Sequence, residues 1–310
     1  MPQANDAPAL PYVRLLGAQV AIGAAAIFAR FALLGTGPLA VSALRMLIAA
    51  IVMLFVVACI GPRSLLGWRR ELAFGVAGLL LALHFATWLS SLLYTSIAVA
   101  VLLVTTAPLW NAIYELAIAR RAPSRSQLIA FSLAASGMAS IALQRSTPAP
   151  IPGHALAGAL LALAGALAIS AYFIIVSAAG AAPREHAPLP TAAIVARTYT
   201  WAALALLVGA VLAHQGPPPL GDLRAWGGIA AMAFVSQLIG HTAMNASLRN
   251  FAPSIVAMTT LLEPPLAALL AVFIFGEALS SQTVIGGLAV LAGVAVTLRS
   301  TASAERMPNA

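Results

Sequence analysis

Polar side chains recur at helical spacing inside two long apolar stretches of this sequence. His84 and Trp88 stand four residues apart in the first stretch, and Gln237, His241 and Asn245 follow at intervals of four in the second. A helix would gather each set on one face. Imidazole, indole and amide groups suit the noncovalent binding of a small amphiphilic molecule in a cavity between the two faces. The alternative is that these side chains only join neighbouring helices.

Charged side chains also lie within apolar stretches, among them Arg30, Arg45, Arg197 and Glu263. In a helix, Arg45 and Arg197 would each lie about 10 Å from the start of the stretch. There a guanidinium can cap a cavity, engage a carboxylate or extend back to the surface. Glu263 could bind protons reversibly, or it could form a fixed ion pair, for which Arg30 is the first candidate partner.

Prolines stand beside polar or aromatic residues in two further stretches. Pro108 is followed by Trp110, Asn111 and Tyr114, and Pro264 comes directly after a glutamate. Proline removes a backbone hydrogen bond and bends a helix. We therefore predict a hinge at each proline, with a static kink as the alternative.

Aromatic side chains complete the set of candidate binding residues. Trp88, Trp110, Tyr114 and Tyr172 lie deep in apolar stretches or share a face with polar groups. Their rings could stack against an amphiphilic or aromatic ligand, and the neighbouring Asn111 could hydrogen-bond to it. Filling space between helices is the alternative role.

The motifs of enzymes and of ATP-driven pumps are absent from the sequence. It contains no Gly-rich phosphate loop, no H-E-x-x-H, no G-x-S-x-G and no cluster of carboxylates. A single cysteine, Cys59, allows neither an intrachain disulfide nor a metal site built of thiolates. We predict no catalytic residues, no metal and no cofactor.

The composition indicates which elements position these residues. Of the 310 residues, 62% are hydrophobic and only 8% are charged, whereas soluble domains carry about a quarter charged residues. The lipid bilayer is therefore the expected solvent. All 16 basic residues are arginine, and no basic run is interleaved with aromatic residues, which argues against nucleic-acid binding.

Ten apolar runs are long enough to cross the roughly 30 Å of bilayer hydrocarbon as helices of about 20 residues. They cover residues 12–34, 38–60, 71–92, 96–119, 126–143, 155–178, 191–213, 225–248, 252–275 and 281–299. The runs lack the two-residue alternation of a membrane barrel. The predicted fold class is an all-α integral membrane protein with ten transmembrane helices.

The arginines segregate between the two sides of this arrangement. Two of them, Arg145 and Arg224, fall on one side. Eleven fall on the side of both termini: Arg14, Arg63, Arg69, Arg70, Arg120, Arg121, Arg125, Arg184, Arg249, Arg299 and Arg306. Because positive charge favours the cytoplasmic side, we predict a multi-pass protein of the bacterial inner membrane with both termini in the cytoplasm.

The two halves of the sequence are related by an internal repeat. The spacing between Pro38 and Arg45 is the same as that between Pro190 and Arg197. A shift of 156 residues also superimposes Pro108 on Pro264, Ser124 on Ser280 and Gly137 on Gly293. Residues 12–144 and 154–299 are thus predicted to form two five-helix repeats, flanked by flexible tails at 1–11 and 300–310. Because five is odd, the second repeat must enter the membrane inverted, as in alternating-access carriers.

The end of the sequence carries motifs of a known family. Leu262-Glu-Pro-Pro265, Gly276-Glu-Ala-Leu-Ser280, Gln282, Gly286 and Gly293 resemble the end of an EamA-type member of the drug/metabolite transporter superfamily. The resemblance covers nearly the whole chain. Within the superfamily, the chain is similar to the bacterial amino-acid exporters. One departure is Arg120-Arg121, where such proteins often carry Gly-Glu after the fourth span, so that Glu277 has no counterpart in the first repeat.

Together these observations predict a gradient-driven secondary transporter that exports small amphiphilic metabolites by alternating access through a central cavity. The resemblance implies amino acids as the leading substrate class. A multidrug or nucleotide-sugar carrier of the same fold, a membrane-embedded enzyme and a non-transporting scaffold remain alternatives. Small residues on the fifth and tenth spans permit close helix contacts, within one protomer or in a homo-oligomer.

Overall fold

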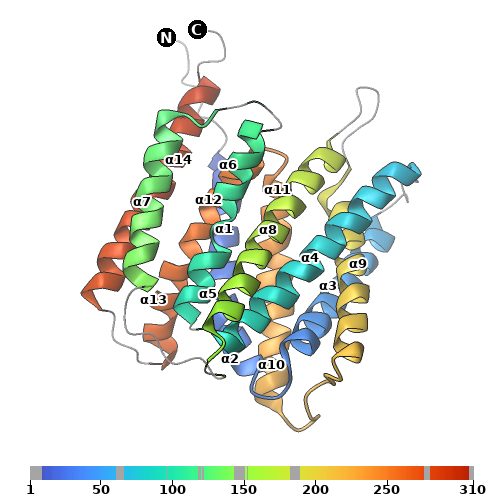
Figure 1. Ribbon diagram of the computed structural model, residues 1–310. Coiled ribbons are helices and arrows are strands. Elements are labelled where there is room, and N and C mark those ends of the chain that lie inside the picture. Colours follow the sequence, from blue (N-terminus) through green and yellow to red (C-terminus); the bar gives the residue numbers. More distant parts are fainter. Residues whose placement is uncertain are drawn as a thin grey trace.

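The computed structural model describes residues 9–60, 66–95, 97–117, 120, 122–142, 151, 153–181, 189–275 and 280–306. Within these residues all regular structure is helical, and the helices form one bundle (Figure 1). By length and composition, nine helical segments of the described chain could each cross a membrane. The all-helical membrane fold predicted from the sequence is confirmed.

The helices follow the predicted order of spans. In the first half they are α1 (Ala9–Gly23), α2 (Ala25–Ala32), α3 (Pro38–Ile60), α4 (Trp68–Tyr94), α5 (Ile97–Val104), α6 (Ala107–Ala117) and α7 (Arg125–Ala142). In the second half they are α8 (Ala155–Gly180), α9 (Thr191–Leu212), α10 (Leu223–Ala231), the π-helix η1 (Met232–His241), α11 (Thr242–Ser247), α12 (Pro253–Thr259), the 3-10 turn η2 (Thr260–Leu262), α13 (Glu263–Phe275) and α14 (Ser281–Arg306).

Each predicted span corresponds to a helix or to consecutive helical pieces. The tenth segment, α7, falls outside the nine most apolar ones because Arg125, Gln127 and several serines dilute its apolar residues. Helix α1 begins at Ala9 and α14 continues to Arg306, so helix extends into both predicted tails. Backbone hydrogen bonds continue there beyond the apolar residues that set the predicted limits.

The two repeats interleave instead of forming separate bundles. Extensive helix packing joins α4 to both α8 and α9, α3 to α9, α7 to α14 and α2 to α10, and each of these pairs takes one helix from each half. The pairs also obey the repeat: the third span packs on the sixth as the eighth packs on the first. This exchange of equivalent spans is the pattern expected of two inverted repeats.

Close approach between helices depends on glycine where α7 crosses α14. A Cβ atom on Gly137 would lie 2.4 Å from the carbonyl oxygen of Gly286, and one on Gly293 would lie 2.7 Å from that of Ala130. Without hydrophobic driving force between helices in lipid, such backbone contact is a main source of packing energy. The small residues of the fifth and tenth spans therefore meet within one chain.

Candidate functional site

A narrow cavity lies in the middle of the bundle, between helices of both repeats. Its side chains leave about 40 Å³ for the centres of water-sized molecules. Five of the sequence-predicted site residues line it: Arg45, His84, Trp88, His241 and Glu263. The predicted faces of the third and eighth spans therefore do meet at one cavity.

Arg45, on α3, brings a positive charge into this cavity and is fully buried. Its Nη2 donates a hydrogen bond to Oε1 of Gln237 at 2.5 Å, and its guanidinium carbon lies 4.0 Å from the centre of the Phe85 ring. Within the described structure its Nε and Nη1 have no hydrogen-bond partner. Because a buried charge requires compensating partners, these two N–H groups can bind an anionic group.

Glu263 brings the opposite charge to the same cavity. It is half-buried at the first residue of α13. Among the described residues its carboxylate forms no hydrogen bond or ion pair, either with Arg45 or with Arg30. Arg30 is exposed near the end of α2, so the ion pair considered from the sequence is not formed. A free carboxylate and a partly unpaired guanidinium thus line one space.

Aromatic and imidazole rings form the walls around these charges. His84 stacks on Trp88 with ring centres 6.3 Å apart and planes at 6°, and Phe85 meets His241 edge to face at 5.3 Å. Nδ1 of His84 lies 2.9 Å from the carbonyl oxygen of Gly165. That nitrogen must carry the proton, which assigns Nε2 as an acceptor.

A π-helix positions the polar side chains of the eighth span. Met232–His241 is π-helical, a rare form that frequently occurs at functional sites. It aims Gln237 at Arg45 and places His241 in the cavity. One turn later, Asn245 accepts a hydrogen bond from the Tyr172 hydroxyl at 2.7 Å. Of the three residues predicted on this face, His241 lines the cavity, whereas Gln237 and Asn245 hydrogen-bond to neighbouring side chains.

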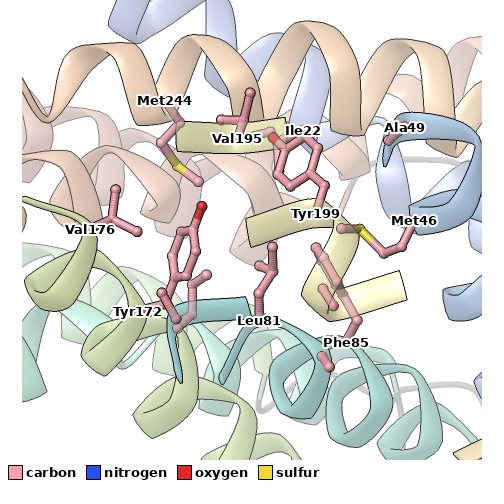
Figure 2. Close-up of a cluster of buried hydrophobic side chains, with 14 of the residues drawn as sticks. Ile22, Met46, Ala49, Leu81, Phe85, Tyr172, Val176, Val195, Tyr199 and Met244 are labelled. Carbon is pink, nitrogen blue, oxygen red and sulfur yellow. The ribbon is translucent and has the colours of Figure 1, made fainter. Parts of the chain in front are cut away.

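Figure 2 shows how the aromatic residues pack beside this region. The Tyr172 hydroxyl points toward Met244, with Val176 and Val195 nearby, whereas Tyr199 lies closer to Phe85. Tyr172 is fully buried. Its ring is a packing element between helices, and its hydroxyl is occupied by Asn245.

Three residues predicted to bind substrate lie away from the central cavity. Trp110 donates its indole N–H to Oγ1 of Thr106 at 3.1 Å, and Asn111 donates its amide to the Ala107 carbonyl at 3.2 Å. Tyr114 is half-buried one turn further along α6 and is not part of the cavity lining. Ala107, one turn before Asn111, does line the cavity, but none of the three side chains does, which helical spacing alone could not reveal.

The helix breaks of the two repeats occur at matched positions. The fourth span is interrupted by a turn at Thr105 and Thr106, before Pro108, and the ninth narrows to the 3-10 turn η2 before Pro264. The repeat shift of 156 residues superimposes the two interruptions. Both adjoin the cavity, because Thr105 and Thr260 line it.

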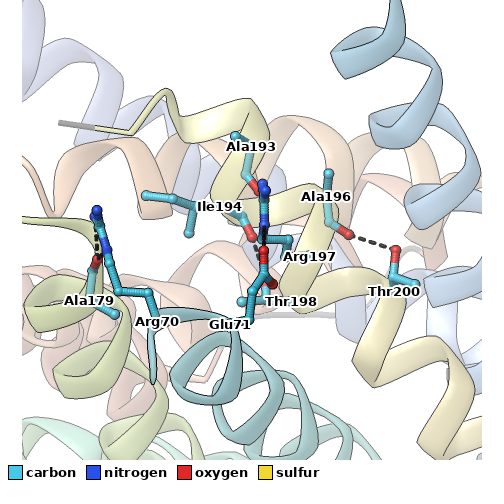
Figure 3. Close-up of polar contacts among 9 residues, drawn as sticks. All are labelled: Arg70, Glu71, Ala179, Ala193, Ile194, Ala196, Arg197, Thr198 and Thr200. Carbon is cyan, nitrogen blue, oxygen red and sulfur yellow. Dashed lines mark hydrogen bonds and ion pairs between the residues drawn. The ribbon is translucent and has the colours of Figure 1, made fainter. Parts of the chain in front are cut away.

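Arg197 is paired within the protein, away from the central cavity. Its Nε lies 2.8 Å from Oε1 of Glu71, joining α9 to the first turn of α4 (Figure 3). Beside it, Arg70 donates to the Ala179 carbonyl at the end of α8. Arg197 thus engages a carboxylate of its own chain. Arg197 and Arg45 occupy equivalent positions of the repeat, but their surroundings differ.

Several cavity residues carried no signal in the sequence. Phe85, Phe173 and Met244 line the cavity but are indistinguishable in sequence from lipid-facing residues. Gln19 was missed as well: it is fully buried and donates to Thr259 at 2.9 Å. A lone glutamine in the first apolar run was the available signal.

Two features of the family motif, Arg121 and Glu277, lie outside the described residues. The relation between the Arg120-Arg121 pair and the Gly-Glu sequence is therefore known from the sequence alone.

Known proteins resemble the chain in sequence and in fold. Residues 10–143 and 156–299 each match the sequence model of the EamA-like transporter family. Among solved structures, 29 chains match. One of them, titled "Crystal structure of protein", aligns with a TM-score of 0.77 and 18% identity, over 97% of this chain and 99% of that one. At that identity the likeness shows the fold alone. No curated protein matches the chain.

Proposed function

Because the chain belongs to the EamA-like transporter family, we propose that it is a secondary carrier that exports small amphiphilic metabolites, amino acids foremost, across a bacterial inner membrane. The observation that carries the substrate class is the pairing of Arg45 and Glu263 in one cavity without an ion pair between them.

A zwitterion would complement both charges at once. The free N–H groups of Arg45 suit a carboxylate, which a guanidinium binds through charge-assisted hydrogen bonds. The Glu263 carboxylate suits an ammonium group. Trp88, Phe85 and Phe173 supply apolar and aromatic walls for a side chain. An unpaired charge inside a membrane costs free energy. A bound zwitterion pairs with both charges and so stabilises the site.

The width of the cavity supports transport by a change of conformation. About 40 Å³ of free space holds roughly one or two waters but no amino acid. Helices must therefore separate before substrate binds. The matched breaks beside Pro108 and Pro264 supply positions at which the two repeats can bend in alternation.

The experiment is flux into liposomes that hold the purified full-length protein. We expect saturable uptake of zwitterionic amino acids from a panel that also contains cationic drugs and nucleotide sugars. Flux of cationic drugs alone would favour a multidrug carrier, since Glu263 without Arg45 would then suffice. Absence of flux for every compound, with the protein folded, would overturn transport in favour of a scaffold, and product formed from a lipid-linked substrate would reveal an enzyme.

A further inference from the structure

A second and much larger cavity opens at one end of the bundle. It offers about 510 Å³ to the centres of water-sized molecules. Its lining comes from the second turn of α1, the first turn of α9 and the last turns of α8 and α11 with the residues that follow. These are the helix ends on the side of both termini. We call this cavity the vestibule; its polar lining residues are Arg14, Ser177, Asn245, Arg249 and Asn250.

The lining of the vestibule is cationic. Arg14 and Arg249 both contribute to it, and no acidic side chain of the described residues does. Arg14 donates one hydrogen bond to Oδ1 of Asn250 through Nη2, but its Nε is buried and has no partner in the described structure. Two arginines beside asparagine and serine side chains form a set of donors that fits an anionic oxygen group.

The vestibule and the central cavity are lined by neighbouring residues of the same helices. On α8, Phe173 lines the central cavity and Val176 lines the vestibule. On α11, Met244 lines the central cavity and the adjacent Asn245 lines the vestibule. Each residue advances a helix by about 1.5 Å, so the two linings are adjacent along both helices.

One hydrogen bond joins α8 to α11 beside both cavities. The Tyr172 hydroxyl donates to Oδ1 of Asn245 at 2.7 Å, and the Asn245 amide donates to the carbonyl of His241 at 2.8 Å. Figure 2 shows the Tyr172 hydroxyl pointing toward the Met244 side chain, with Val176 to one side of the ring. Asn245 lines the vestibule and the adjacent Met244 lines the central cavity, so this contact lies next to both linings.

We propose that the vestibule is a second binding site, which holds the carboxylate of the transported metabolite at Arg14 and Arg249 before it passes Tyr172 and Asn245 to the central cavity. The inference rests on the proposed function. It assigns the two sites different chemistry: the vestibule selects for a carboxylate alone, whereas the central cavity selects for a zwitterion. The phosphate of an anionic lipid headgroup shares that chemistry, and the test separates the two sources.

The test is equilibrium dialysis of radiolabelled 3-phenylpropionate, a carboxylate without an ammonium group, against the full-length protein in phosphatidylcholine nanodiscs. Arg45→Gln removes the guanidinium of the central cavity. In that background we expect 3-phenylpropionate to bind, and Arg14→Gln with Arg249→Gln to weaken its binding by about tenfold or more. Phenethylamine lacks the carboxylate and can bind only through Glu263 of the central cavity, so its binding should be insensitive to Arg14→Gln with Arg249→Gln.

Matched variants separate charge recognition from misfolding. Arg299→Gln removes an exposed arginine of α14 that is not part of the vestibule, and its binding should equal that of the background. Arg249→Lys keeps the charge and should retain most of the binding. Each variant is compared by its melting temperature, so that a loss of binding in a folded protein is attributed to the site.

The outcomes also separate this inference from the proposed function. Binding that is absent, or insensitive to Arg14 and Arg249, overturns the vestibule site even if amino-acid flux is found. Arg-dependent binding supports it even if the wild type proves to move another carboxylate. A lipid headgroup would give a different pattern. Phosphatidylglycerol in the nanodiscs would then abolish the binding of 3-phenylpropionate, and the protein would retain this lipid only when Arg249 is present. That result would refute the substrate site.

Discussion

Arg45 and Glu263 lie in one cavity, yet each retains hydrogen-bonding capacity that the described part of the protein does not satisfy. A structural ion pair would have brought the two groups together and used that capacity. Gln237 and the Phe85 ring hold the guanidinium in place without neutralising it. At the scale of single residues, the site therefore offers hydrogen-bond donors and acceptors that a ligand can satisfy.

Replacing Arg45 tests recognition of the carboxylate. In Arg45→Gln we expect liposome uptake of L-phenylalanine to fall about tenfold or more, because charge-assisted hydrogen bonds are lost. Uptake of phenethylamine, which has no carboxylate, should change far less. Arg299→Gln is the control for loss of one exposed arginine. Equal losses for both compounds would show that Arg45 acts through packing alone.

Replacing Glu263 tests recognition of the ammonium group. Glu263→Gln keeps the size of the side chain and removes its charge. We expect uptake of phenylalanine and phenethylamine to fall about tenfold, while uptake of 3-phenylpropionate is retained. Selectivity between the three compounds is the measured quantity. An unchanged selectivity would contradict a role of Glu263 in binding.

The same variant tests proton coupling. We expect a pH gradient to stimulate phenylalanine uptake in the wild type and to lose that effect in Glu263→Gln, because this carboxylate is the acidic group in the described lining of the cavity. If the mutant responds to the gradient as the wild type does, Glu263 has no part in coupling.

At the scale of elements, four spans that contact the cavity are irregular. The first breaks at Ala24, the fourth at Thr105 and Thr106, the eighth is π-helical and the ninth contains a 3-10 turn. Irregular backbone in a membrane is tolerated where it faces protein or a wet cavity. The long helices α3, α4, α8 and α9 supply the continuous framework against which these spans can bend.

Proline substitutions test whether the matched breaks are hinges. Alanine at Pro108 or Pro264 restores a backbone donor and favours a straight helix. We expect the maximal rate of phenylalanine uptake to fall while binding stays within about twofold, because the conformational step is slowed. Pro217→Ala, in an exposed loop, should leave both unchanged. Unaltered uptake in both hinge variants would identify static kinks.

A pair of glycines tests the packing of α7 on α14. Gly137→Ala places a Cβ 2.4 Å from the Gly286 carbonyl oxygen, so we expect a loss of about 1–3 kcal/mol of stability from overpacking. Gly17→Ala meets no atom within 4 Å and should leave the melting temperature unchanged or raise it. Thermal unfolding in detergent measures both. Equal melting temperatures would show that the two helices separate easily.

At the scale of the whole molecule, interleaving gives the two repeats their common cavity. Each half supplies one partner to every major helix pair, so neither half encloses the site alone. A change in one repeat is felt directly by the other, which is the physical requirement for exposing one site to two faces in turn.

Cysteine labelling tests the orientation of this bundle. In a Cys59→Ser background, Leu220→Cys lies in the exposed loop before α10, and Trp68→Cys lies at the opposite end, at the start of α4. Following the positive-inside rule, an impermeant maleimide should label Leu220→Cys in intact cells and Trp68→Cys only after permeabilisation. The reverse pattern would place both termini outside.

The sequence by itself determined the number, order and approximate limits of the helices and their inverted repeat, because the bilayer imposes a length and an apolar character on every span. Helical spacing also identified the faces that carry His84 and His241. Only the tertiary structure decided that Arg197 pairs with Glu71 while Arg45 reaches the cavity, that Trp110, Asn111 and Tyr114 are not part of its lining, and that Phe85 and Met244 are. Helix rotation, local breaks and contacts between distant spans fix those properties, and in an apolar environment the side chains that face lipid and those that face a cavity belong to the same residue types.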